Sequence, residues 1–278
     1  MISRIDAHQH FWKFDAAQYS WIGADQHVLR RDFSPADLEP ELAAAGIGGS
    51  IAVQAQQNIE ETRWLLALAD RHPFLQGVVG WAPLIDVNVA ATLEQLAAHP
   101  KLRALRHVLH DEADDDYMLR EDFNRGVVEL KRFGLAYDVL IFDRHLPQTI
   151  EFVDRHPNQV FIVDHLAKPR VREGLVSPWW ENMRKLGQRP NVYCKVSGLA
   201  TEADHTGWSE QQLLSYMNIV LEIFGPKRIL FGSDWPVCLL AIGYSKWAEI
   251  VAKFADQLTE EERERIWSAS AREAYQLK

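Results

Sequence analysis

The residue pattern with the clearest chemical potential lies near the start of the chain, where Asp6, His8 and His10 alternate with Ala7 and Gln9. Successive side chains of a β-strand point to opposite faces, so this alternation predicts that Asp6, His8 and His10 share one face of a strand. Two imidazoles on one strand face can converge on a metal ion or on a substrate. Such a pair needs further ligands or catalytic groups from elsewhere in the chain.

Eight apolar runs that alternate with helical stretches would have to position those groups. The runs predicted as strands cover residues 1–12, 50–54, 75–81, 102–109, 134–142, 160–165, 192–197 and 229–234. Several contain Val, Ile and Leu without polar alternation, which is typical of parallel strands buried on both faces. Helices are predicted over 35–45, 60–71, 87–99, 121–133, 147–156, 181–186 and 209–224, with two more after the last strand. Thr259 and Glu262 form a capping box for the last of these helices.

Eight βα units in a chain of 278 residues favour one α/β domain over residues 1–278, a TIM (β/α)8 barrel distorted by extra loops and C-terminal helices. A doubly wound open sheet is the alternative, but no glycine-rich phosphate-binding loop follows the first strand. Neither a shift in composition nor a flexible linker suggests a second domain.

A barrel of this kind places its chemistry at the carboxyl ends of the strands. Polar and aromatic side chains expected there are His8, His10, Gln54, Trp81, Arg106, His107, His110, Asp138, Asp164, His165, Lys195, Ser197, Ser233, Asp234 and Trp235. Burying so many ionisable groups costs free energy, which a barrel without a functional site has little reason to spend.

Each of these residues also has a structural interpretation. His165 could be a hydrogen-bonded core histidine, Asp234 could cap a turn, and Lys195 could form a salt bridge inside the barrel. Arg106 and His107 are adjacent and point in opposite directions, so one faces the site and the other faces away; the sequence does not decide which.

Composition excludes several classes of protein. The chain has 30 basic and 39 acidic residues and a net charge of −9, which argues against a nucleic-acid or anionic-membrane surface. Two cysteines, Cys194 and Cys238, cannot build a disulfide framework, and we expect reduced thiols in a cytoplasmic enzyme. The remaining histidines fall in loops or helix ends and are expected at the surface: His27, His72, His99, His145, His156 and His205.

Four sequence motifs resemble the amidohydrolase superfamily, and more narrowly its branch of sugar-lactone hydrolases. They are His8-Gln9-His10-Phe11-Trp12, Val163-Asp164-His165-Leu166-Ala167-Lys168-Pro169, Phe231-Gly232-Ser233-Asp234-Trp235-Pro236 and Ser270-Ala271-Arg272-Glu273-Ala274-Tyr275. The resemblance spans nearly the whole chain. One small departure is Ser270, where relatives usually carry asparagine.

The resemblance implies hydrolysis of an aldonolactone, with L-fuconolactone foremost, to the sugar acid. Asp234 would act as the general base, and His165 with Arg106 or His107 would stabilise the oxyanion. Substrate contacts are expected from Gln54, Trp81, His110, Asp138, Lys195 and Trp235. The tryptophans could equally be core residues.

Two departures from the family pattern bear on metal binding. Binuclear members use a strand-four lysine where this chain has Arg106 and His107, and metal-dependent relatives place a histidine on strand five where this chain has Asp138. We therefore expect at most one divalent ion, zinc foremost, held by His8, His10 and Asp234, and a reaction that could proceed without it.

Several alternatives remain open at this point. The lactone could be a rhamnonolactone or a muconolactone. A metal-dependent decarboxylase of the same superfamily is a second possibility, although the missing strand-five histidine counts against it, and a non-catalytic sugar-binding barrel is a third. A small-molecule sugar lactone is the expected partner, and both a monomer and a homodimer are compatible with the sequence.

Overall fold

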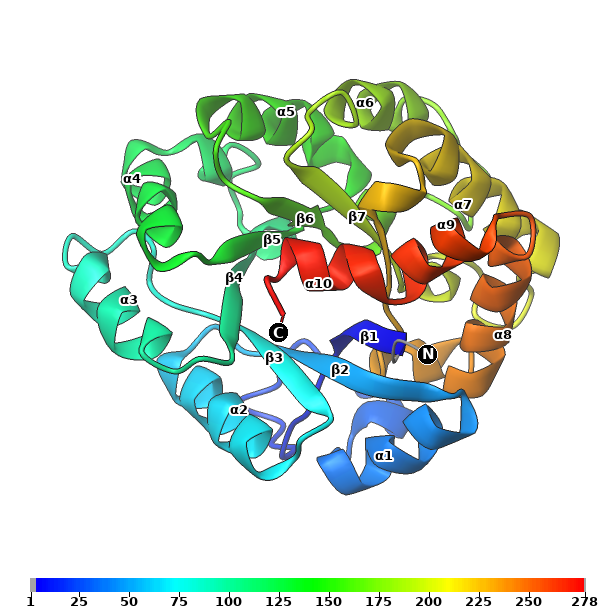
Figure 1. The fold of residues 1–278 in the computed structure, drawn as a ribbon, viewed down its shortest axis with the longest axis horizontal. Coiled ribbons are helices and arrows are strands. Elements are labelled where there is room, and N and C mark those ends of the chain that lie inside the picture. Colours follow the sequence, from blue (N-terminus) through cyan, green and yellow to red (C-terminus); the bar gives the residue numbers. More distant parts are fainter. Residues whose placement is uncertain (1–3, 278) are drawn as a thin grey trace.

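The computed structural model, which describes residues 4–277, contains one sheet of eight parallel strands in chain order (Figure 1). The strands are β1 (Arg4–Gln9), β2 (Ile47–Val53), β3 (Leu75–Gly80), β4 (Leu102–Val108), β5 (Ala136–Leu140), β6 (Phe161–Val163), β7 (Val192–Val196) and β8 (Ile229–Phe231). Two hydrogen bonds close the ring, because the amide of His10 donates to the carbonyl of Trp235 at 2.7 Å and the amide of Asp234 donates to the carbonyl of His8 at 2.8 Å. The predicted TIM barrel is therefore confirmed.

An outer ring of helices covers the strands (Figure 1). They are α1 (Pro35–Ala44), α2 (Ile59–Arg71), α3 (Val89–Ala97), α4 (Glu121–Leu130), α5 (Leu146–Arg155), α6 (Trp179–Leu186), α7 (Glu210–Phe224) and α8 (Tyr244–Ala255), and α9 (Glu260–Glu264) and α10 (Ser270–Ala274) follow them in the chain. The capping box of Thr259 and Glu262 is present at the start of α9, as predicted. None of the helices between residues 4 and 277 has the length and apolar character that crossing a membrane requires.

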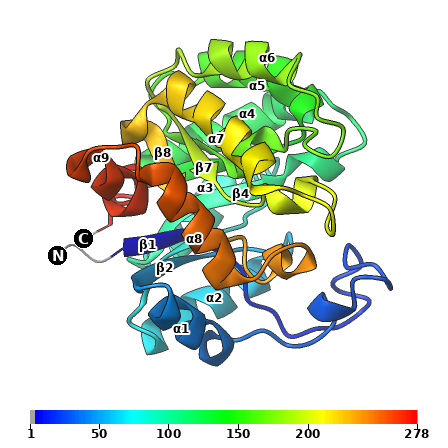
Figure 2. The ribbon, with the colours of Figure 1, turned by 90° about the vertical axis from the view of Figure 1, so that its right-hand side faces the viewer.

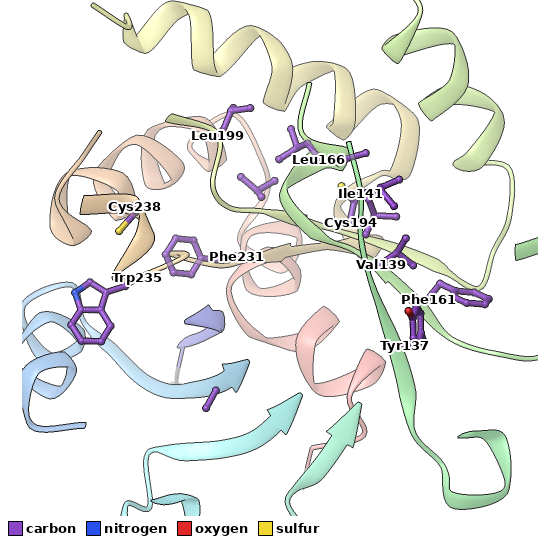
Figure 3. Close-up of a cluster of buried hydrophobic side chains, with 14 of the residues drawn as sticks. Tyr137, Val139, Ile141, Phe161, Leu166, Cys194, Leu199, Phe231, Trp235 and Cys238 are labelled. Carbon is purple, nitrogen blue, oxygen red and sulfur yellow. The ribbon is translucent and has the colours of Figure 1, made fainter. Parts of the chain in front are cut away.

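Apolar side chains form two layers. Inside the barrel, small and branched residues near the strand starts pack against α10, which crosses one opening of the barrel and inserts Tyr275 (Figure 1). Outside it, a larger layer lies between strands and helices, and Figure 3 shows the part that includes Tyr137, Phe161 and Phe231. Cys194 and Cys238 are free thiols in this outer layer.

The two ends of the barrel differ in character. The start of β1 and α9 lie at one end, and the long connection from β1 to α1 lies at the opposite end (Figure 2). That second end receives the carboxyl ends of the strands, so the polar residues that follow them gather there.

Candidate active site

The first strand is irregular at the point where it delivers its histidines. Ile5 and Ala7 point into the barrel, and the pairing of β1 with β2 shifts register between Asp6 and Gln9. Because an extra residue in a strand re-aims the side chains after it, His8 and His10 also face the interior. Asp6 faces outward toward α8, so the prediction that it shares a face with the two histidines is wrong.

Asp6 instead links β1 through hydrogen bonds to the segment that follows β8. Its carboxylate accepts hydrogen bonds from the amide of His8 (3.1 Å), the amide and hydroxyl of Ser233 (2.9 and 2.6 Å) and the hydroxyl of Tyr244 (3.0 Å). Burial raises the pKa of Asp6 to about 6, although these hydrogen bonds oppose the rise. The junction holds Asp234 opposite the histidines.

His8, His10 and Asp234 bring three donor atoms together. His8 Nε2 lies 3.1 Å from His10 Nε2, and Asp234 Oδ1 lies 3.3 Å from His10 Nε2 and 3.6 Å from His8 Nε2. Ligand atoms about 2.0–2.2 Å from a tetrahedral zinc ion would be roughly 3.3–3.6 Å apart. The Nδ1 atom of His10 lies 2.8 Å from the carbonyl oxygen of Val53, an outer contact that orients a metal-ligating imidazole. The three residues therefore fit a single divalent ion.

His165 reaches this cluster from an unusual turn. Residues 165–168 all have positive φ, from 47° to 58°, although none is glycine, a conformation that costs about 1–2 kcal/mol per residue. The turn places His165 Nδ1 2.8 Å from the hydroxyl of Ser197 and His165 Nε2 3.8 Å from Asp234 Oδ1. Burial holds the pKa of His165 well below its usual range, so the ring is neutral.

Asp234 itself is ionised. Burial opposes its charge, but His165 and His10 hold its pKa below the usual range for aspartate. Asp234 also has a positive φ of 58°. The base predicted from the sequence is thus a carboxylate held in a strained backbone position among three imidazoles.

The side chains of Arg106 and His107 in β4 point to opposite faces of the sheet. The guanidinium of Arg106 faces the interior, where it donates to Asp164 at 3.0 Å and lies 3.4 Å from His8 Nε2. His107 points the other way, where it contacts Glu112 at 2.6 Å and stacks on Tyr117 with ring centroids 5.0 Å apart. His107 is therefore not placed to act on a ligand in the barrel. Of these two adjacent residues, Arg106 is the one that faces the site.

A buried charged network lies beneath the histidines. Lys195 forms ion pairs with Asp138 and with Asp164, the second at 2.9 Å, and Tyr275 donates to Asp138 at 2.8 Å. Burial raises the pKa of Asp138, whereas Lys195 and His8 hold the pKa of Asp164 well below its usual range despite its burial. Lys195 and Asp138 are fully buried, so the expectation that they contact a sugar directly does not fit their position.

A cavity of about 420 Å³ opens above this cluster. Its lining residues come from loops and strand ends and are His10, Trp21, Gln26, Ala55, Arg106, Val108, His110, Asp111, Leu140, Phe142, His165, Lys168, Thr201, Glu202, His205, Asp234, Val237 and Leu240. Five of the predicted site residues are among them. His110 stacks on Phe142, and burial lowers its pKa to about 3, so it is neutral.

Three other predicted contacts do not line the cavity. Trp235 is 2% exposed and its ring packs against Phe11 and Phe33 in the outer layer. Trp81 donates to His107 outside the barrel interior, and the side-chain amide of Gln54 donates to the carbonyl of Arg106 at 3.2 Å. Trp235 thus follows the core interpretation, whereas Trp81 is half-buried beside His107.

The sequence reasoning missed several cavity residues on loops. Lys168 forms a 2.7 Å ion pair with Glu202 at the cavity wall, and Trp21 comes from the long β1–α1 connection. The motif that contains His165 also contains Lys168, which was a usable signal. His145 and His156 are buried instead of lying at the surface, and His205 lines the cavity.

Comparisons with known proteins agree with this geometry. Residues 5–277 match the family described as Amidohydrolase. A curated L-fucono-1,5-lactonase from Burkholderia multivorans is 41% identical over 285 residues, which cover 99% of this chain and 96% of that protein. A second L-fucono-1,5-lactonase, from Burkholderia ambifaria, is 37% identical over 284 residues, 100% of this chain and 97% of that protein. A crystal structure of an amidohydrolase from Burkholderia multivorans with bound zinc superposes with a TM-score of 0.96 at 41% identity, covering 99% of this chain and 100% of that one.

Proposed function

The chain belongs to the amidohydrolase family, and we propose on that basis that it hydrolyses a sugar lactone to the sugar acid, with L-fucono-1,5-lactone as substrate. The observation that carries the proposal is the meeting of Asp234, His165 and Arg106 at the wall of one cavity of about 420 Å³. These are a base, a neutral hydrogen-bonding group and a cation, the set that ester hydrolysis needs.

Asp234 is the proposed general base. Its carboxylate takes a proton from a water molecule, and the oxygen of that water adds to the lactone carbonyl carbon. The tetrahedral intermediate then collapses with cleavage of the ring carbon–oxygen bond, and the departing ring oxygen receives the proton from Asp234. The atoms of one water are added in total, and the product is the open-chain acid.

Arg106 and His165 are the proposed stabilisers of the oxyanion. The guanidinium of Arg106 supplies a fixed positive charge in a mostly buried site, where such charges act strongly. The hydroxyl of Ser197 lies 2.8 Å from His165 Nδ1. In the proposed mechanism this hydroxyl donates to Nδ1, which puts the proton of the neutral ring on Nε2, where it faces the cavity.

His8, His10 and Asp234 would hold one zinc ion. When bound, it would add positive charge beside the reacting carbonyl. The proposed proton transfers involve only groups of the chain.

Lys168 and Glu202 are the proposed contacts for the sugar hydroxyls. Both charged groups line the cavity, and their side chains are each 19% exposed. A charged donor and a charged acceptor side by side can bind two neighbouring hydroxyl groups. Leu140, Val108 and Val237 provide apolar wall for the carbon skeleton.

The proposal is tested by a pH-indicator assay over a panel of sugar lactones and muconolactones. Release of acid identifies a lactonase, release of carbon dioxide a decarboxylase, and release of neither a binding protein. Asp234→Asn is expected to lower kcat by about 10²–10⁴ with the fold intact, because it removes the base. Asp111→Asn, a second carboxylate of the cavity wall, is the matched control and should retain activity. Near-normal turnover by Asp234→Asn would overturn the assignment.

A further inference from the structure

The lysine and arginine side chains of the cavity wall are already paired with carboxylates of the chain. Within residues 4–277, Arg106 and Lys168 are the two such residues that line the cavity. Arg106 donates to Asp164 at 3.0 Å, and Lys168 forms an ion pair with Glu202 at 2.7 Å. A carboxylate on a ligand would therefore have to compete with a carboxylate of the chain for either cation.

Lys168 lies among carboxylates. Glu202 contacts it directly, and Asp111, a second carboxylate of the cavity wall, is close enough for Lys168 to oppose the rise that burial causes in its pKa. The Asp111 side chain is 62% exposed, whereas those of Lys168 and Glu202 are each 19% exposed. Water screens an exposed charge strongly, so the less exposed Glu202 is the residue that decides what Lys168 can bind.

The backbone holds the two partners in place. Lys168 is the last residue of the left-handed turn that begins at His165, and its amide donates to the carbonyl of His165 at 2.8 Å. Glu202 ends a short 3-10 helix that follows β7, and its carbonyl accepts a hydrogen bond from the amide of Arg172 at 3.0 Å. The ion pair is therefore built into the cavity wall, on the same turn as one of the proposed oxyanion stabilisers.

Such a pair treats hydroxyl groups and carboxylates differently. A hydroxyl group can donate to Glu202 and accept from Lys168 at the same time, so a hydroxylated ligand binds without breaking the ion pair. A carboxylate only accepts, and it must either displace Glu202 from the ammonium or lie beside it. Because both side chains are mostly buried, water reduces the repulsion between the two carboxylates only in part.

We propose that Glu202 is a specificity-determining residue, which excludes lactones that carry a carboxylate and thereby limits the substrate to uncharged, hydroxylated lactones. The inference rests on the proposed function, because it concerns the substituents of the lactone that this site hydrolyses. It also separates two lactone classes that the sequence left open. Sugar lactones without an acid group fit the pair, whereas a muconolactone carries a carboxylate and should be a poor substrate.

Two lactones that differ at one carbon atom test the proposal. L-Galactono-1,4-lactone has a hydroxyl group on C6, and the galactaro-1,4-lactone of the same configuration has a carboxylate there. In the pH-indicator assay, we expect the kcat/KM of the parent to be at least about tenfold higher for the uncharged lactone. In Glu202→Gln, KM should fall about tenfold for the carboxylate lactone and rise about threefold for the uncharged one, because an amide is the weaker acceptor. Changes of opposite sign distinguish this role from a general loss of structure, which would impair both reactions.

Two further variants serve as controls. Glu202→Asp keeps the negative charge and should keep the preference for the uncharged lactone. Glu210→Gln is the matched control, because Glu210 on α7 is paired with Lys253 and does not line the cavity, and it should leave the preference unchanged. Equal kcat/KM values of the parent for the two lactones, or an unchanged preference in Glu202→Gln, would overturn the proposal.

Calorimetric titration with the same two lactones separates this inference from the proposed function. If the parent cleaves no lactone of the panel, the proposed function fails, and both compounds remain intact as ligands whose Kd values can be compared. Tighter binding of the uncharged lactone by the parent, with a smaller difference in Glu202→Gln, would still support the role of Glu202. Equal binding of the two lactones, or binding of neither, would contradict it.

Discussion

Gly198→Ala would change the spacing of the proposed catalytic groups without removing any of them. Gly198 has a φ of 60°, and a Cβ atom at this position would lie 2.6 Å from His165 Nδ1 and 3.1 Å from Asp234 Oδ2. Ordinary contact begins at 3.4 Å. The His165 ring would therefore have to retreat by about 0.8 Å, the difference between 3.4 and 2.6 Å.

The size of this displacement sets the expected effect on catalysis. A misplacement of about 1 Å in an active site can lower the rate on the order of 10²-fold. We expect kcat/KM of Gly198→Ala for a sugar lactone to fall by roughly 50-fold or more. Its free energy of unfolding should fall by about 2–5 kcal/mol, because a left-handed alanine costs about 1–2 kcal/mol and overpacking adds about 1–3 kcal/mol.

Gly46→Ala is the matched control. Gly46 has a φ of 66°, and a Cβ atom there would meet nothing within 4 Å. The variant should lose only the left-handed backbone cost of about 1–2 kcal/mol and keep its kcat/KM. Initial rates from the pH-indicator assay and thermal unfolding measure both quantities. If Gly198→Ala keeps kcat/KM within twofold of the parent, the position of His165 is not part of the catalytic arrangement.

Two further predictions concern Glu61 and Lys168. Burial raises the pKa of Glu61 from 4.5 to about 7, so between these pH values the folded chain holds a proton that the unfolded chain has released. The free energy of unfolding should therefore fall by up to about 3 kcal/mol as pH rises from 4.5 to 7. Thermal unfolding from pH 5 to 8 should show a smaller pH dependence for Glu61→Gln, whose side-chain amide can still contact Tyr19 and the amide of Ala55, and an unchanged dependence would refute this. Lys168→Met should raise KM roughly tenfold for a hydroxylated sugar lactone but little for unsubstituted δ-valerolactone; equal effects on both substrates would show that Lys168 does not bind the hydroxyls.

The fold was predictable because its signals are local. Several strands are apolar runs without polar alternation, and many of the helices are bounded by polar or turn-forming residues. The strand starts and ends agree less well, most clearly in β6 and β8, which end at Val163 and Phe231. Asp164 and Gly232 follow these strands, and the chain then turns to aim His165 and Asp234 into the barrel, so the last predicted strand residues belong to the site.

The direction of the Asp6 side chain could not be predicted from the regular alternation of side chains along a strand. The register shift in β1 depends on pairing with β2 and on hydrogen bonds from Ser233 and Tyr244, which lie 227 and 238 residues away in sequence. A regular strand with His8 and His10 inside would place Asp6 inside as well. Only the bulge lets the carboxylate close the barrel from outside while both imidazoles reach the cavity.

The depth of a side chain in the barrel, by contrast, was available from the sequence. Leu140 lines the cavity, and Asp138 on the same strand precedes it by two residues, which corresponds to roughly 6–7 Å along a parallel strand. Lys195 likewise precedes Ser197, whose hydroxyl contacts His165, by two residues. Inward-facing residues of a barrel form layers, so residues two positions before the strand end belong to the layer below the ligand. Counting back from the last inward residue therefore places Asp138 and Lys195 below the ligand. Arg106 also precedes the cavity-lining Val108 by two residues and pairs with Asp138 between β4 and β5, but its long side chain reaches the cavity wall.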